Sequence, residues 1–184
     1  MKLSEIIKSR RTSGPAQFSG EEVSKEQIDQ LLEAANWAPT HRKTEPWRFK
    51  VLRGDSLKQL GEFLGKKYQE TASKYSEFKH KKTVLKPQQS SAVIAICMQR
   101  DPDERVPEWE ELAATAMAVQ NLWLTATEMG LGGYWSSPGT IEYMDEFFQL
   151  LPGEKCLGFF YLGHLQTPSP ERIPGPIEDK TEWL

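Results

Sequence analysis

The stretch IIKSRRTS, residues 6–13, ends an amphipathic segment in two arginines and two hydroxyl side chains. Arginine presents a planar fork of N–H donors that suits phosphate oxygens, and a neighbouring hydroxyl adds a neutral donor. Arg10, Arg11 and Thr12 are therefore candidates for an anion site. Taken alone, they are more simply the solvated basic end of a short helix, where arginine also interacts favourably with the helix dipole.

A second stretch, APTHRKTEPW at residues 38–47, begins where Pro39 is expected to end a helix. Alone it is an ordinary loop. Together with residues 6–13, it favours a ligand with a phosphate at one end and a flat ring, covered by the loop, at the other. Neither stretch contains a metal-ligand cluster, a nucleophile with its base or a Gly-rich nucleotide-binding loop.

Hydrophobic periodicity predicts helices and strands along the whole chain. The expected helices are residues 3–10, 24–38, a segment from 55 onward, 109–129 and 141–150. The expected strands are 47–52, 91–98 and 156–163, and residues 134–139 are expected to form a short strand followed by a turn. Ser24 is the expected N-cap of the second helix, with Gln27 as its capping-box partner. Residues 91–98 are apolar throughout, which is typical of a central strand. Residues 66–87 are polar and lysine-rich, and fit either a helical lid or a mobile loop.

Residues 109–129 form the longest predicted helix, capped at its C-terminal end by Gly130. This helix is apolar on nearly every face, which indicates burial all round. In a chain of 184 residues, such burial suggests a second subunit. The tail, residues 166–184, is rich in proline and has little periodicity, so we expect it to wrap over the body or over a partner.

The bulk composition favours one soluble domain spanning residues 1–184, with no linker to divide it. Hydrophobic residues make up 38% and charged residues 27%, a mixture that argues against disorder. The net charge of −3 gives no general attraction for nucleic acid. Cys97 and Cys156 lie in apolar runs and are expected to be reduced core residues. No signal-peptide region and no apolar run of membrane length is visible, so a cytoplasmic protein without membrane association is expected.

The spacing from residues 6–12 through 28–39 to Pro46-Trp47 resembles the N-terminal signature of the nitroreductase family, whose members are FMN-dependent oxidoreductases. The segment GLGGYW, residues 130–135, resembles the Gly-Leu-Gly segment that leads to the ring-contacting strand of that family. The closing strand, residues 157–163, also fits, so the resemblance covers almost the whole chain. The short-chain members, which keep a histidine in the loop before Pro-Trp, are the most similar.

This resemblance implies particular contacts to FMN, and no metal site or catalytic side chain. Arg10, Arg11 and Thr12 would hold the phosphate and ribityl chain. Thr40 and His41, supplied by the other subunit, would touch the ring and ribityl chain. The remaining implied contacts lie along the ring, with backbone groups contributing much of the binding, at Trp135, Ser136 and Ser137.

The sequence departs from the family pattern at three positions. Common members have Asn within the loop and Gln before Pro-Trp, where this chain has Lys43 and Glu45. Long members have a C-terminal arginine that reaches the phosphate, whereas the surroundings of Arg172, the tail arginine here, do not clearly match. These departures affect the polar contacts expected at the edge of the flavin ring, and therefore the expected substrate preference.

The fold implied by the resemblance is an α+β sandwich, with a mainly antiparallel central sheet flanked by helices on both faces in an intertwined homodimer. The implied reaction passes a hydride from NAD(P)H to the flavin and then electrons to a small-molecule acceptor, a nitroaromatic, a quinone or a similar compound. Three alternatives stay open: a flavin enzyme with other chemistry, such as dehalogenation or flavin destruction; a non-catalytic flavin-binding or electron-carrier protein; and an interaction protein that has lost FMN.

Overall fold

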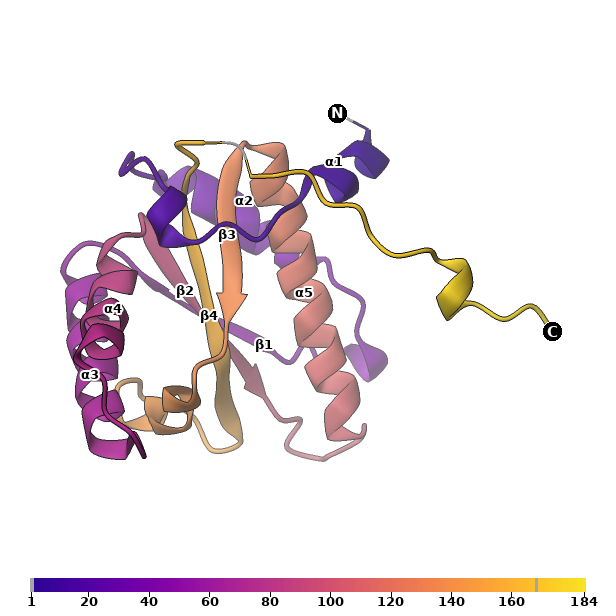
Figure 1. Ribbon diagram of the computed structural model, residues 1–184. Coiled ribbons are helices and arrows are strands. Elements are labelled where there is room, and N and C mark those ends of the chain that lie inside the picture. The colour runs from indigo at the N-terminus through magenta and orange to yellow at the C-terminus, as the bar shows by residue number, and fades with distance from the viewer. Residues whose placement is uncertain (1, 168) are drawn as a thin grey trace.

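A computed structural model describes residues 2–167 and 169–184. Its centre is a four-stranded sheet in the order β1-β2-β4-β3, in which every neighbouring pair is antiparallel (Figure 1). The strands are β1 (Trp47–Leu52), β2 (Ala92–Gln99), β3 (Leu131–Ser136) and β4 (Glu154–His164). β1 and β3 are therefore the two edge strands of this sheet.

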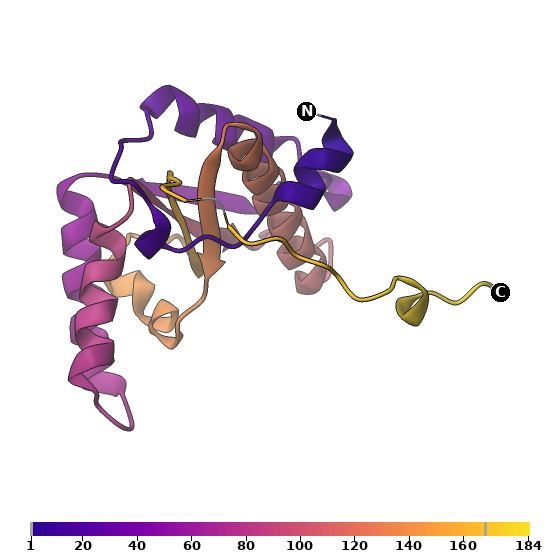
Figure 2. The same cartoon turned by 45° about the horizontal axis from the view of Figure 1, so that its top comes forward.

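Helices cover both faces of the sheet, as Figures 1 and 2 show. One face packs against α2 (Lys25–Asn36) and α5 (Glu108–Glu128), and the other against α3 (Asp55–Thr71), α4 (Glu77–Gln88) and a 3-10 segment (Gly139–Glu146). The short α1 (Leu3–Ser9) and the 3-10 turns Pro15–Gln17, His41–Lys43 and Glu178–Lys180 complete the described elements. The predicted α+β architecture with helices on both faces is confirmed.

The central strand β2 supplies both hydrophobic cores. Ile94 and Ile96 point into the cluster under α2 and α5, whereas Val93, Ala95 and Cys97 point into the cluster under α3. Successive side chains of a strand face opposite sides of the sheet. A strand covered on both faces must therefore be apolar throughout, which explains the uninterrupted run at residues 91–98.

Most predicted elements lie where the sequence places them. Ser24 caps α2, because its hydroxyl accepts the Gln27 amide at 3.2 Å while the Gln27 side chain accepts the Ser24 amide at 2.9 Å. The lysine-rich residues 66–87 belong to α3 and α4, which form a helical hairpin. Gly61 permits the close approach of these helices, since a Cβ there would lie 2.2 Å from the Val84 carbonyl oxygen.

The helix predicted at residues 141–150 is present with shifted bounds, as a 3-10 helix over Gly139–Glu146. The amide of Ile141 bonds the carbonyl of Pro138, and the amide of Phe147 bonds that of Met144. Apolar side chains at positions 141, 144 and 147 are three residues apart. The 3-10 helix has three residues per turn and aligns them on one face, which packs into the core beneath α3.

Within a single chain, α5 is not buried all round. Its inner face is buried, but Trp109 is 67% exposed, and Leu112 and Met117 are exposed on the outer side. The prediction that a second subunit covers this helix stays a prediction. None of the helices in the described residues is long and apolar enough to cross a membrane.

The C-terminal segment leaves the body beside α1 and extends outward (Figures 1 and 2). It starts from a bridge between Phe18 and Leu165, and beyond it Ile173 and Trp183 are almost fully exposed. Apolar side chains in this position have no core of their own, so the prediction that the tail wraps over a partner remains open.

Candidate functional site

Arg10 follows the end of α1, where its amide still bonds the carbonyl of Ile6 at 3.0 Å. Its guanidinium lies over the Trp123 ring on α5, 4.3 Å from the ring centre. The buried Nη1 atom of Arg10 has no hydrogen-bond partner among the described residues. A buried donor left unpaired costs on the order of 1–3 kcal/mol. An anionic group bound at this atom would remove that penalty.

Arg10, Arg11 and Arg172, which we call the arginine cluster, line one pocket of about 420 Å³ together with Thr12. Burial lowers the pKa of Arg10, and the charges of Arg172 and Arg11 lower it further. Glu171 also lines the pocket, so the pocket has three guanidinium groups and one carboxylate, a net positive charge. The structure thus brings Arg172 next to the predicted anion site, although its sequence neighbourhood gave no clear match.

The two predicted arginines differ in what they contact. The Arg11 side chain donates to three backbone carbonyls, those of Lys8 (2.6 Å), Pro170 (2.9 Å) and Arg10 (3.0 Å). Next to it, the hydroxyls of Ser13 and Ser169 lie 2.8 Å apart. Arg11 and Ser13 therefore fix the start of the tail against the N-terminal turn, which places Arg172 near Arg10.

The N-terminal turn also runs beside β3. The Ser13 amide bonds the Gly133 carbonyl at 3.2 Å. Three residues further along β3 is Ser136, at a distance of about 10 Å by the rise of an extended strand. An elongated ligand beside this edge strand could thus reach from the arginine cluster to Ser136, and edge strands offer unpaired N–H and C=O groups.

At the far end of β3, Trp135 and Ser136 have defined partners. The Trp135 indole donates to the Leu157 carbonyl at 3.2 Å. Gly158 has a φ of 147°, and a Cβ there would lie 2.4 Å from the Trp135 indole nitrogen, so only glycine allows this packing. Ser136 accepts a hydrogen bond from the Lys86 ammonium at 3.0 Å, and Ser137 is exposed.

Lys86 is a further candidate site residue, which the sequence analysis did not single out. Its ammonium lies 4.4 Å from the centre of the Tyr161 ring and 4.9 Å from that of Tyr134. Burial, and then the charge of Lys82, lower the pKa of Lys86 to about 8. In the sequence Lys86 is one lysine of a polar, lysine-rich run, and only its packing under β3 and β4 separates it from its solvated neighbours.

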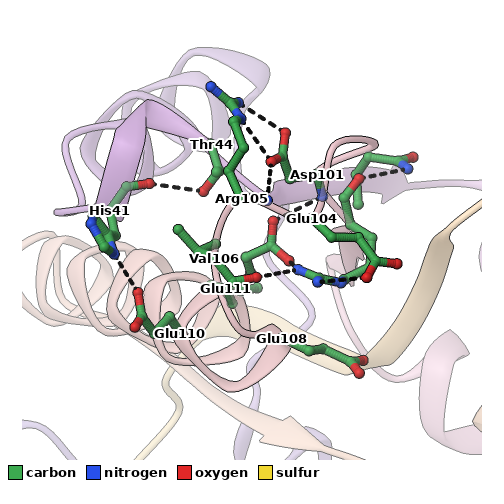
Figure 3. Close-up of polar contacts among 12 residues, drawn as sticks. His41, Thr44, Asp101, Glu104, Arg105, Val106, Glu108, Glu110 and Glu111 are labelled. Carbon is green, nitrogen blue, oxygen red and sulfur yellow. Dashed lines mark hydrogen bonds and ion pairs between the residues drawn. The ribbon is translucent and has the colours of Figure 1, made fainter.

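Thr40 and His41 lie elsewhere in the chain. The Thr40 hydroxyl accepts the Glu45 amide at 3.2 Å, and His41 Nδ1 lies 2.6 Å from Glu110 Oε2 in the first turn of α5 (Figure 3). Arg10 packs on Trp123 of the same helix, thirteen residues on, which is about 20 Å at the rise of an α-helix. Within one chain, the two halves of the predicted site are therefore well separated.

The carboxylates near the start of α5 serve structure, as Figure 3 shows. Glu111 is buried, accepts the Asp101 amide at 2.9 Å and pairs with Arg100. Arg105 donates two side-chain hydrogen bonds to Asp101 and holds the pKa of that carboxyl down to about 2. Each of these acids has a basic partner, so this cluster offers no poised acid–base pair.

Comparisons with known proteins, by sequence and by structure, agree with the fold described above. The sequence pattern described as the nitroreductase family matches residues 7–164, and the chain therefore belongs to the nitroreductase family. The chain is 31% identical to YfhC of Bacillus subtilis strain 168, provisionally named an NAD(P)H nitroreductase, over 97% of this chain and 92% of that protein.

Two solved structures share the fold. A nitroreductase-like family protein from Bacillus cereus matches with a TM-score of 0.84 and 27% identity, covering 100% of this chain and 96% of that one. A protein from Desulfovibrio desulfuricans, described as a nitroreductase in complex with FMN, matches with a TM-score of 0.73 and 23% identity, covering 95% of this chain and 93% of that one.

Proposed function

We propose that this protein is an FMN-dependent NAD(P)H oxidoreductase that acts as a homodimer. The observation that supports it most is the buried Nη1 atom of Arg10, which has no partner within residues 2–167 and 169–184 and belongs to a side chain that shares its pocket with Arg172. This group suits the phosphate of FMN, because a dianion forms short, charge-assisted hydrogen bonds with guanidinium groups. Family membership makes FMN the expected anion.

Several residues of this chain fit the rest of the cofactor. Thr12 would add a hydroxyl donor beside the phosphate, and the outer edge of β3 at Trp135, Ser136 and Ser137 would lie along the ring. Lys86, held at Ser136, would place positive charge near the ring edge, where it favours negative charge on the bound group. Bound FMN would supply the two-electron redox chemistry between NAD(P)H and a nitroaromatic, quinone or similar acceptor. The side chains of this protein then need only bind and orient.

Two observations support a homodimer with shared sites. Thr40 and His41 lie about 20 Å along α5 from the residue that Arg10 contacts, so within one chain they stand apart from the arginine cluster. Beside His41, the exposed Trp109 and Met117 line an apolar pocket of about 360 Å³. A second copy packed on this face would cover these side chains and receive the loop of residues 40–45 at its own site.

The decisive experiment is to purify the protein, record its absorbance spectrum and measure flavin per chain. We expect a yellow protein with about one FMN per chain. Oxidation of NADH and NADPH is then followed with a panel of nitroaromatic and quinone acceptors. A colourless protein that takes up no added FMN contradicts the proposal, and a flavin-loaded protein that oxidises neither nucleotide identifies an electron carrier instead.

A further inference from the structure

One face of α4 carries three lysines, Lys79, Lys82 and Lys86, which we call the lysine row. Their spacing of three and four residues places them on the same side of the helix. Among residues 2–167 and 169–184, no carboxylate forms an ion pair with any of the three, whereas Lys81, on another face of the same helix, pairs with Glu77 at 2.8 Å. The lysine row is therefore a line of positive charge without an ion-pair partner in the described part of the chain.

The lysine row leads from solvent to the strand that would carry the ring. Lys79 and Lys82 are exposed, and Lys86 is half-buried with its ammonium on Ser136. Lys82 is one turn before Lys86, close enough for its charge to disfavour the charged form of Lys86 and so lower its pKa. An anion entering between them would relieve this repulsion.

We propose that Lys82 is a specificity-determining residue that favours electron acceptors carrying a carboxylate or another anionic group on the reducible ring. The inference rests on the proposed function, because it takes Ser136 as the ring end of the site. Positive charge one helical turn from Lys86, which itself bonds Ser136, would raise the local concentration of an anionic substrate there, and a direct contact with Lys82 would add to its affinity. A neutral acceptor of the same shape gains neither.

The test compares two acceptors of matched shape, 4-nitrobenzoate and 4-nitrobenzamide, in steady-state kinetics of the protein with its flavin. We expect Lys82→Gln to lower the ratio of kcat/KM for benzoate over benzamide by about two- to fivefold, the range of an exposed charge pair. Taking the ratio within each variant removes the intrinsic difference in reducibility. Lys82→Arg should keep the wild-type ratio, and Lys81→Gln, which removes a neighbouring charge, should leave it unchanged.

A binding measurement separates this inference from the proposed function. Calorimetry with the redox-inert pair benzoate and benzamide on the purified protein should show the same loss of preference for the anion in Lys82→Gln. An unchanged preference in Lys82→Gln overturns the inference, whether or not the protein turns over nitroaromatics. A change in the NADPH-to-NADH ratio with no change for the acceptors also overturns it, because Lys82 would then face the nucleotide phosphate. If no acceptor is reduced and no nucleotide is oxidised, but Lys82→Gln still loses the binding preference for benzoate over benzamide, only the proposed function is contradicted.

Discussion

The guanidinium of Arg10 lies 4.3 Å from the centre of the Trp123 ring, a contact that joins the end of α1 to the C-terminal half of α5. The face of the Trp123 ring attracts the guanidinium cation, and this attraction does not use the N–H donors of Arg10. Nη1 is buried and has no hydrogen-bond acceptor among the described residues. This contact, more than the presence of two consecutive arginines, separates Arg10 from the solvated helix end that the sequence alone also allowed.

Arg10→Ala should weaken FMN binding by about 1.5–3 kcal/mol, because a charge-assisted contact in a partly buried site is lost. FMN titration followed by fluorescence measures the affinity. Lys81→Ala, which removes an exposed charge already paired with Glu77, is the control and should have little effect. Equal affinities in the two variants would mean that Arg10 does not contact the phosphate.

Arg11→Ala should release the start of the tail, since its side chain bonds the Pro170 carbonyl at 2.9 Å. We expect faster tryptic cleavage after Arg172, detected by mass spectrometry of the time course. Lys2→Ala removes a basic residue from the other end of α1 and should leave the cleavage rate unchanged. If trypsin cleaves the Arg11→Ala variant no faster than the parent, other contacts hold the tail.

Lys86 should make stability depend on pH. Its folded pKa of about 8 is below the usual 10.5, so the unfolded state binds more protons between these values. The contribution of Lys86 to the free energy of unfolding is therefore lowest below pH 8, and it increases as the pH rises from 8 towards 10.5.

The variant Lys86→Met isolates this effect, because it keeps an apolar stem and removes the charge. Urea titrations give the free energy of unfolding of variant and parent. As the pH rises above 8, the parent should become more stable relative to the variant. Lys81→Met, on the exposed face of α4, should give a difference that stays flat over the same range. A flat difference for Lys86→Met would show that its ammonium is fully solvated.

Met117→Glu should disrupt the proposed dimer, because Met117 is exposed at 40% on the apolar outer face of α5 and a buried unpaired charge is strongly unfavourable. Light scattering should give a smaller mass than for the parent, and flavin content should fall with it. Leu151→Glu places the same charge at an exposed apolar position outside α5 and should remain dimeric. A dimeric, flavin-loaded Met117→Glu protein would place the interface elsewhere.

Local features of the sequence were enough for much of the fold. The strand at residues 47–52 and the Ser24 cap of α2 are where the sequence puts them, because alternation and capping depend on residues a few positions apart. The sequence predicted a helix near Gly139–Glu146 but did not specify its 3-10 type, since an apolar spacing of three fits two helix types over so short a segment. Only packing beneath α3 selects between them.

The sequence by itself determined the family, the apolar central strand and the arginines at the end of the first helix as an anion site to be tested. The tertiary structure alone decided that Arg172 lies beside Arg10, that Lys86 contacts Ser136, and that His41 lies far along α5 from Trp123. The reason is physical. These contacts join residues far apart in the chain, and their distances depend on how helices pack on the two faces of the sheet, which no local periodicity records.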